Sequence, residues 1–467
     1  MSGGTALAAL FNTLLVFLIP RLVSVEDFGY WRLFLLYAGY AGFLHMGFAD
    51  GALLRWAGKP LEEFRHEVAP AMTFLIRQQL AVIVPASVIV AVLLPSPMNW
   101  IGVAILVFAV IMNVATVLQY GLQGARLFRP VAIATAIPGG GLLALTFLWH
   151  LRGTPGFREL IVFYGMAWAA ALVYLWTRVR PLHGAHAPDA AWSLGKTCVL
   201  LGWPIVLANG GLGLVQSADR VIVSSALPIY DFAQYSLASS MMFVPVAVIA
   251  AVYRVFFSHV AAVEHEGRAR VYTRASRFLL LAWSLLLPYF FVLDVFVRHF
   301  LPKYVEALPA AGILLLGVIF LAGIQILHMS FAYLYGKQRQ FLLLTASALL
   351  VSFAVALVLA IRLRSLVAVA VGQIGVLALW WLANEWTFRK TTGQRAADRL
   401  RLAAVFAWSA VSYGVAMKSV ENVGLRTLIY YALVAGCLVV ACAPEIRIAW
   451  KLVSRASPWT FVYGTRG

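Results

Sequence analysis

Two stretches of this sequence match each other: Arg21-Leu-Val-Ser-Val-Glu-Asp-Phe-Gly-Tyr30, and the looser Arg220-Val-Ile-Val-Ser-Ser-Ala-Leu-Pro-Ile-Tyr-Asp-Phe-Ala-Gln-Tyr235. Each copy follows a long apolar segment and precedes another. A repeat constrains the architecture before any single residue does. In a membrane protein, repeats also indicate where a binding site lies, because such sites form where the two repeats meet. The motif therefore predicts a chain built from two related halves.

The composition places both halves in a membrane. Of all residues, 63% are hydrophobic and only 12% are charged, with a mean hydropathy of +0.88. A helix that spans the hydrocarbon needs roughly 20 apolar residues, because lipid offers the backbone no hydrogen-bond partner. Segments of that length recur from end to end. The first, from Thr5 to Ile19, lacks the basic start and cleavage site of a signal peptide and is predicted to be a retained span.

The basic charge has a topological explanation. The net charge is +18, but the Lys and Arg residues are scattered between apolar segments rather than gathered on a polar domain. This pattern argues against a nucleic-acid partner. The three cysteines, Cys198, Cys437 and Cys442, lie in apolar segments without a Cys-x-x-Cys pair, so they are predicted to be packing residues. No metal site is predicted.

The apolar segments predict an all-α polytopic membrane protein with about 14 transmembrane helices. Longer polar loops divide these helices into an N-terminal lobe of six (1–180), a C-terminal lobe of six (181–390) and a final pair with its tail (391–467). Because six is even, the two lobes share one orientation, and a pseudo-twofold axis along the membrane normal should relate them. The predicted spans are 5–23, 30–56, 70–94, 98–120, 131–150, 157–177, 196–216, 232–257, 278–297, 308–334, 341–361, 366–386, 402–416 and 426–443.

Loop charges orient this topology. Most loop Lys and Arg residues fall on one alternating set of loops, and the positive-inside rule then puts both termini in the cytoplasm. Every loop is too short to hold a catalytic or nucleotide-binding domain of about 50 residues or more. The function is therefore expected to lie within the bilayer.

The repeated motif resembles a known family. An Arg-Leu pair ends the first helix, a Ser-x-Glu-Asp-Phe-Gly-Tyr turn follows, and the second helix closes with Gly47-x-x-Asp50-x-Ala52-x-x-Arg55. This pattern resembles the oligosaccharide flippases of the multidrug, oligosaccharidyl-lipid and polysaccharide exporter superfamily. The second half agrees through three further short motifs: Gly202-Trp203-Pro204, Asp219-Arg220 and Tyr235-x-x-Ala238.

The resemblance implies a substrate and a location. Such flippases move undecaprenyl-diphosphate-linked oligosaccharide repeat units from the cytoplasmic to the periplasmic leaflet of the bacterial inner membrane by alternating access. The product serves surface polysaccharides such as the O-antigen of lipopolysaccharide. Implied partners are the lipid-linked substrate, membrane lipids, a polysaccharide polymerase and a chain-length regulator. The first apolar run (5–19) carries no charge, unlike the Arg-rich first helix of the lipid II branch, which favours a repeat-unit flippase.

A diphosphate needs fixed cations and a hydroxyl-rich head needs hydrogen-bond partners, and Arg can bind phosphate through two parallel donors. Asn209, Gln216 and Arg220 are spaced by seven and four residues, so one continuous helix would carry them on one face. The alternative is that amides bond to neighbouring helices while arginines extend to the interface. The candidate lumen and substrate residues are Arg32, Arg77, Asn209, Gln216, Arg220, Gln325 and His328.

A second set of residues is a candidate for ion coupling. Asp50 either carries a coupling proton or forms an ion pair with Arg55 or Arg77. It lies eighteen residues after Arg32, which is five turns of one continuous helix, so the two side chains are predicted to share one face. His45, near the middle of the same segment, can titrate near neutrality, or can bond to a neighbouring backbone group instead.

Other functions remain open on the sequence. An ion-coupled multidrug exporter of the same superfamily would need buried carboxylates for cationic cargo. An integral-membrane glycan polymerase or ligase would need a sizeable outer loop. The sequence has no His-Glu-x-x-His motif, nucleophile elbow or Walker motif, which favours a transporter over an enzyme. No cofactor is predicted, and a H+ or Na+ gradient or the membrane potential is expected to supply the energy.

Overall fold

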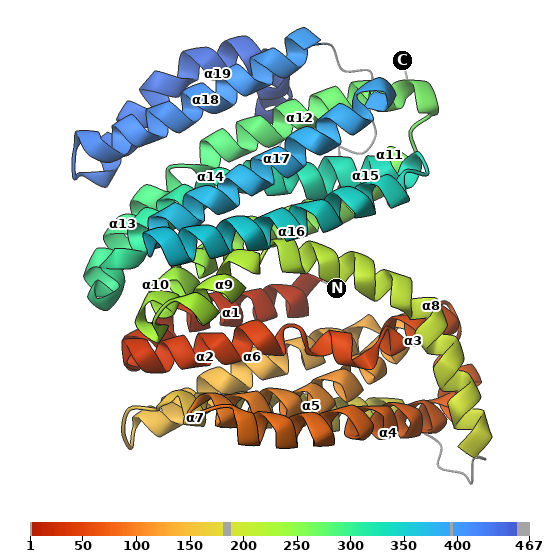
Figure 1. The fold of residues 1–467 in the computed structure, drawn as a ribbon. Coiled ribbons are helices and arrows are strands. Elements are labelled where there is room, and N and C mark those ends of the chain that lie inside the picture. Colours follow the sequence, from red (N-terminus) through yellow and green to blue (C-terminus); the bar gives the residue numbers. More distant parts are fainter. Residues whose placement is uncertain (1, 181–187, 393–395, 455–467) are drawn as a thin grey trace. The chain divides into compact units, whose positions relative to one another are not determined.

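The computed structural model describes residues 2–180, 188–392 and 396–454, and every regular element in these ranges is a helix (Figure 1). The chain forms two compact units, which we call unit 1 (Met1–Leu237) and unit 2 (Ala238–Gly467). The lobe boundaries predicted near residues 180 and 390, and the pseudo-twofold relation, stay predictions, because compactness within a unit does not test them.

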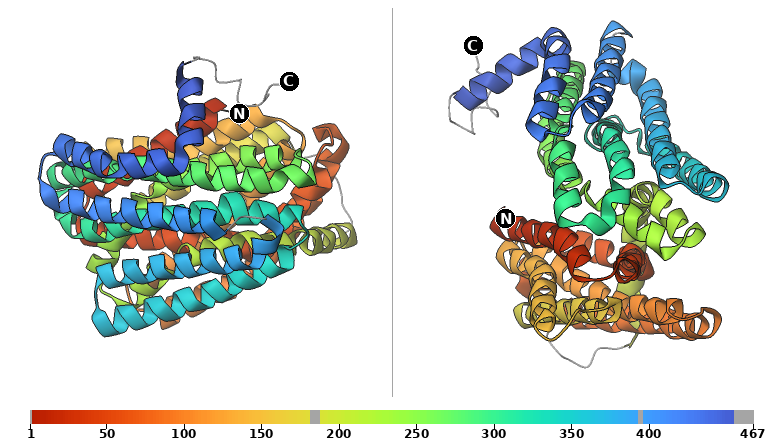
Figure 2. Two further views of the ribbon diagram at one scale, coloured as in Figure 1. Left: turned by 90° about the horizontal axis from the view of Figure 1, so that it is seen from above. Right: turned by 90° about the vertical axis from the view of Figure 1, so that its left-hand side faces the viewer.

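Unit 1 contains the first ten helices and one short 3-10 helix, coloured red to yellow-green in Figures 1 and 2. The last of them, α10, runs three residues past the division between the units. Its elements are α1 (Ser2–Leu22), α2 (Val25–Ala38), η1 (Ala41–His45), α3 (Phe48–Trp56), α4 (Leu61–Leu93), α5 (Met98–Gly124), α6 (Phe128–His150), α7 (Phe157–Val179), α8 (Pro188–Val215), α9 (Ala218–Ala226) and α10 (Ile229–Ser240).

Unit 2 holds the remaining helices, coloured green to blue. The last of them, α19, bends at Cys442, two residues before Pro444 (Figure 2). Its elements are α11 (Phe243–Ala261), α12 (His265–Leu286), α13 (Tyr289–Phe300), η2 (Pro302–Ala307), α14 (Leu308–Ala322), the π-helical η3 (Gly323–His328), α15 (Met329–Leu334), α16 (Gln338–Leu363), α17 (Leu366–Thr392), α18 (Ala396–Ser419) and α19 (Val423–Ser454).

The helices confirm the predicted fold class, an all-α polytopic membrane protein. Within the described ranges, 11 helices are long and apolar enough to cross a membrane. The first, second and eighth predicted spans fall outside this set. The first coincides with a shorter apolar helix, Leu7–Leu22, and the other two are interrupted, as α2–η1–α3 and as α10–α11. The total of fourteen spans stays a prediction.

The first copy of the repeated motif is a helix cap. Ser24 precedes α2, and its Oγ accepts a hydrogen bond from the Asp27 backbone N at 3.0 Å and donates to Asp27 Oδ2 at 2.7 Å. Ser is a preferred N-cap because its oxygen satisfies a backbone donor that the helix leaves unpaired. The other oxygen, Asp27 Oδ1, accepts from the Phe157 backbone N at 3.1 Å. The turn therefore starts α2 and fixes the beginning of α7.

The two motif copies pack against each other within unit 1. A Cβ on Gly29 would lie 2.8 Å from both Cγ1 and the carbonyl oxygen of Ile229, and 3.3 Å from Cβ of Ala233. Any side chain at this position would separate α2 from α10. The Gly of the motif is explained by this close approach of two helices rather than by chemistry.

Aromatic side chains form much of the core around α3, α4 and α5. Trp56 stacks on Phe64 with ring centroids 5.0 Å apart, and Phe48 stacks on Phe74 at 5.3 Å. Trp56, Phe48 and Phe64 are fully buried. Between helices in lipid, van der Waals contact of this kind supplies the stability that the hydrophobic effect supplies in water.

Candidate functional site

The second predicted span is not one continuous helix. Met46 (φ 51°) and Gly47 (φ 83°) adopt left-handed backbone conformations that no α-helix continues through, and a 3-10 turn replaces the helix between α2 and α3. Gly adopts this conformation without steric cost. The prediction that Arg32 and Asp50 share one face across five turns is therefore wrong.

Side chains from two other helices stabilise this break. Gln78 Nε2 on α4 donates to the Leu44 carbonyl at 2.8 Å, and Asn113 Nδ2 on α5 donates to the Ala41 carbonyl at 3.0 Å. The backbone N of Gly47 donates to His45 Nδ1 at 3.2 Å, and His45 is buried. These bonds satisfy backbone groups that lipid would leave unpaired. Of the two interpretations of His45, the structure shows the backbone contact.

Beyond the break, α3 packs on α8 with backbone against backbone. A Cβ on Gly51 would lie only 1.8 Å from the Cys198 carbonyl oxygen, and one on Gly47 would lie 2.4 Å from the Trp203 backbone N. On the facing helix, a Cβ on Gly202 would lie 1.9 Å from the Gly47 carbonyl oxygen. Small residues four apart allow this approach between membrane helices.

Before the break, α2 meets α9 through polar side chains. Tyr37 Oη lies 3.1 Å from Ser224 Oγ, and Tyr40 Oη lies 2.5 Å from Ser217 Oγ. The guanidinium groups of Arg32 and Arg220 interact electrostatically on the same pair of helices. Two predicted lumen residues from opposite ends of unit 1's sequence thus come together.

Within the described ranges, the two arginines form no ion pair. Neither forms an ion pair with a carboxylate among the residues that the structure describes. Arg32 Nε is buried and has no hydrogen-bond partner there, and Cζ of the same residue lies 6.0 Å from the centroid of the Phe28 ring. Arg220 Nη2 donates to the Gln216 carbonyl at a long 3.5 Å. The pair therefore presents positive charge and N–H groups that can donate hydrogen bonds to an anion.

Sequence reasoning missed one acid beside this pair. Asp219 is 3% exposed; its Oδ2 accepts from Tyr235 Oη at 2.6 Å, and its Oδ1 accepts from the Arg220 backbone N at 2.8 Å. Its carboxylate attracts the Arg220 side chain electrostatically without contacting it as an ion pair. Asp219 was quoted only in the short Asp219-Arg220 motif, and nothing in the sequence indicated its pairing with Tyr235.

The other predicted residues of unit 1 do not join the arginine pair. α8 ends at Val215 and α9 begins at Ala218, so the seven-and-four spacing does not run along one helix. Gln216 Nε2 donates to the Leu212 carbonyl within its own helical turn. The side chain of Asn209 lies outside the described residues, and Arg77 lies on an exposed face of α4.

Arg55 forms an ion pair, but with a different acid from the one predicted. Its Nε and Nη2 donate to the two carboxylate oxygens of Glu67 at 2.8 and 2.7 Å, and Trp56 Nε1 adds a bond of 2.9 Å. Asp50 is partly exposed and forms no ion pair with any described side chain. The Arg55 interaction therefore ties α3 to α4, and the coupling role of Asp50 stays a prediction.

In unit 2, Gln325 and His328 lie in the π-helical turn η3 and are 9% and 0% exposed. His328 Nε2 lies 3.1 Å from Tyr272 Oη on α12 and 3.3 Å from Glu385 Oε1 on α17. Sequence reasoning named neither Tyr272 nor Glu385. The contact of Gln325 and His328 with a sugar stays a prediction, since this conformation buries both.

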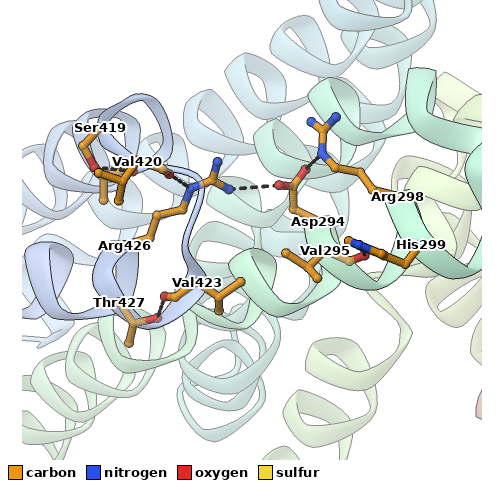
Figure 3. A network of polar contacts seen from close by, with 10 residues as sticks. Asp294, Val295, Arg298, His299, Ser419, Val420, Val423, Arg426 and Thr427 are labelled. Atoms are coloured by element: carbon orange, nitrogen blue, oxygen red, sulfur yellow. Dashed lines mark hydrogen bonds and ion pairs between the residues drawn. The ribbon is translucent and has the colours of Figure 1, made fainter.

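A second ionic cluster of unit 2 joins α13 to α19 (Figure 3). Asp294 accepts from Arg298 Nε at 3.0 Å and from Arg426 Nη1 at 2.9 Å. Arg426 also donates to the Val420 carbonyl. Asp294 is 2% exposed and Arg426 is 8% exposed. Here two cations share one buried carboxylate, in contrast to the arginine pair of unit 1.

No family model matches the sequence, and no curated protein matches it either. Solved structures do resemble the fold. A structure of the lipid II flippase MurJ in an inward closed conformation gives a TM-score of 0.73 at 11% sequence identity, covering 95% of this chain and 98% of that chain. An inward-facing multidrug resistance transporter of the MATE family, in the MOP superfamily, gives 0.63 at 12% identity, covering 85% and 97%. The chain is therefore a multi-pass membrane protein with the fold of these transporters.

Proposed function

We propose that this protein is a flippase for a lipid-diphosphate-linked oligosaccharide, which it carries from the cytoplasmic to the periplasmic leaflet by alternating access. The observation that carries the proposal is that Arg32 and Arg220 interact with each other while neither forms an ion pair with a carboxylate in the described part of the chain. The shared fold with a lipid II flippase supports it, and the absence of charge from residues 5–19 of the first helix, α1, favours an oligosaccharide repeat unit as the cargo.

The two arginines suit a diphosphate in particular. Two like charges held close in a membrane protein repel each other, and a doubly charged anion between them turns that repulsion into attraction. Hydrogen bonds to charged groups stabilise by about 1.5–3 kcal/mol each. Arg32 Nε, buried and without a partner, is a donor that becomes satisfied when a phosphate oxygen arrives.

Asp219 has a supporting part in this site. Tyr235 Oη and the Arg220 backbone N hold its carboxylate in place, so its charge stays beside Arg220 while the anion leaves. Without it, the empty site would contain two cations and no anion at all. We assign Asp219 to holding the empty site together rather than to contact with the cargo.

Further parts of the proposal follow the sequence. We place the protein in a bacterial inner membrane with both termini in the cytoplasm, and we expect a H+ or Na+ gradient or the membrane potential to drive it. The sugar head would serve surface polysaccharide such as O-antigen, with a polymerase and a chain-length regulator as partners. An ion-coupled multidrug exporter is the second candidate, but the arginine pair would repel its cationic cargo.

Reconstitution tests the function directly. Purified protein is placed in liposomes with a fluorescent undecaprenyl-diphosphate oligosaccharide, and the fraction of label that becomes accessible to an impermeant quencher is followed over time. We expect protein-dependent flipping that Arg32→Ala and Arg220→Ala each abolish. The matched control is Arg298→Ala in unit 2, which should flip at the wild-type rate.

Three outcomes decide the proposal. Protein-dependent flipping lost in both arginine variants supports it. If the wild-type protein does not move the lipid but exports a cationic dye from the same liposomes, the protein is a multidrug exporter and the proposal is wrong. Flipping that survives Arg32→Ala and Arg220→Ala together overturns the assignment of the site. Arg220→Lys should restore only part of the rate, because Lys cannot donate two parallel bonds to phosphate.

A further inference from the structure

Three buried titratable side chains contact one another in the interior of unit 2. Tyr272 Oη donates to Glu385 Oε1 at 2.5 Å, and His328 Nε2 lies 3.1 Å from Tyr272 Oη. Tyr272 and His328 are fully buried and Glu385 is 6% exposed. Ionisable groups inside membrane spans are expensive to maintain, and by default they mark a function.

The three residues come from separate helices that meet at an irregular turn. Tyr272 lies on α12, Glu385 on α17, and His328 ends the π-helical turn η3. Single π-helical turns inside α-helices occur frequently at functional sites. The aromatic rings of Trp381 and Phe388 flank His328, each with its centroid 6.2 Å from that of the imidazole. The cluster is thus enclosed by apolar groups.

Other charged groups on the elements packed against η3 have separate partners or exposed positions. Arg268 on α12 donates to the Val263 carbonyl, and Arg277 pairs with Glu445. Arg389 on α17 lies over the Trp386 ring, and Lys337 lies over Phe388. The remaining described titratable side chains on these elements are Tyr253 and His259 on α11, Arg270 and Arg274 on α12, and Tyr333 and Tyr335 at and beyond α15.

The geometry permits one defined proton transfer. His328 Nδ1 is buried without a hydrogen-bond partner among the described residues, so it is the open basic position. A proton that binds Nδ1 releases the proton on Nε2 to Tyr272 Oη, while Tyr272 passes its own proton to Glu385 Oε1. The products are His328 protonated at Nδ1, neutral Tyr272 and neutral Glu385, so one proton enters and one negative charge disappears.

We propose that Tyr272, His328 and Glu385 form the binding site of the coupling proton, with one proton bound per transport cycle. His328 is the entry, Tyr272 the relay and Glu385 the final acceptor. Because all three are buried here, the proton exchanges with water only in another conformation, and such occlusion is what couples an ion to transport. The coupling rests on the flippase function proposed above, whereas the proton site itself does not.

Infrared difference spectroscopy of the purified protein tests the site without any substrate. We expect the carbonyl band of a protonated carboxylic acid in apolar surroundings, at a higher frequency than the band of exposed acids, to appear as the pH is lowered and to be absent from Glu385→Gln. The matched control is Glu67→Gln, which removes the ion-paired acid of α4 and should retain the band. A wild-type protein without such a band, or a band that survives Glu385→Gln, overturns the proposal.

Two further variants keep the test decisive if Glu385→Gln does not fold. His328→Gln should shift the midpoint of the band's pH titration, because the basic entry position is lost. Tyr272→Phe should keep the band, since the acid remains. A midpoint unchanged in His328→Gln contradicts the role of the imidazole.

Liposome flipping under a pH gradient tests the coupling. With one proton per cycle, a gradient of one pH unit should change the steady-state distribution of the labelled lipid about tenfold. Glu385→Gln and Tyr272→Phe should lose this dependence. If flipping by the wild-type protein does not depend on the pH gradient, the proposed proton coupling is wrong but the proposed flippase function is not affected. If the wild-type protein does not flip the lipid but shows the expected infrared titration, the proposed flippase function is wrong and the proton site is still supported.

Discussion

Arginines have different partners in unit 1 and in unit 2. In unit 2, Asp294 binds both Arg298 and Arg426, and Glu445 lies 3.8 Å from Arg277. In unit 1, Arg32 and Arg220 lie close enough to repel each other and form no ion pair with a described carboxylate. A cation that holds a carboxylate joins two helices, whereas a pair of cations without one leaves a place for an anion from outside.

The same contrast exists inside unit 1. Arg55 binds Glu67 through two parallel bonds and ties α3 to α4, yet it lies on the same broken span as Arg32. Both are arginines in a membrane helix segment, and composition alone treats them alike. What separates the structural arginine from the candidate functional one is whether it forms an ion pair with an acid on the neighbouring helix.

The largest expected effect comes from removing both unpaired cations. Arg32→Gln combined with Arg220→Gln should lower the flipping rate by about a hundredfold or more, because each charged hydrogen bond to the diphosphate is worth about 1.5–3 kcal/mol. The thermal stability should stay equal or rise, since the like-charge repulsion disappears. Flipping assays and melting curves in detergent measure the two quantities. A large fall in melting temperature would show that the pair stabilises the fold instead.

In unit 2, by contrast, loss of a buried arginine is expected to lower the stability. Arg426→Leu leaves the buried Asp294 with only Arg298 as a partner and should cost about 3–5 kcal/mol of the free energy of unfolding. Chemical unfolding in micelles measures it. A double variant, Asp294→Asn with Arg426→Gln, removes both charges and should be less destabilised than Arg426→Leu. A single variant as stable as the wild type would contradict the role of this pair.

A smaller effect is expected where α3 meets α8. Gly51→Ala places a Cβ 1.8 Å from the Cys198 carbonyl oxygen, so the helices must move apart, at a cost of about 1–3 kcal/mol. The matched control is Gly165→Ala on α7, where nothing lies within 4 Å of the added Cβ. The control should be neutral or slightly stabilising, because Ala favours helix over Gly. Equal melting temperatures for both variants would show that the two helices separate freely.

The smallest effect is expected for Arg298, the exposed arginine of the Asp294 cluster. Arg298 binds the same carboxylate as Arg426, but its side chain is 53% exposed. Exposed ion pairs contribute about 0–1 kcal/mol. Arg298→Ala should therefore change the unfolding free energy and the flipping rate very little. A loss as large as that of Arg426→Leu would mean that burial does not distinguish the two arginines.

The sequence pointed to some residues of the candidate sites and not to others, for reasons that particular residues show. Arg32 and Arg220 were both named as candidates, because a charge inside an apolar segment is conspicuous. Their adjacency was not predicted, since it depends on how α2 packs on α9. Tyr272 was missed because it lay outside the predicted spans, and Glu385 because it lay at the end of one; only their contact with His328 distinguishes them.

By itself, the sequence determined the class of protein and much of its local structure. Apolar segments of spanning length required helices in a membrane, and the Ser24 to Asp27 turn carried its own cap, because hydropathy and capping act over a few neighbouring residues. The tertiary structure alone decided where the second span breaks, since the amides that satisfy its backbone come from Gln78 and Asn113 on other helices. It also decided which cations are paired and which are not, because an ion pair depends on distances across space that residue order does not encode.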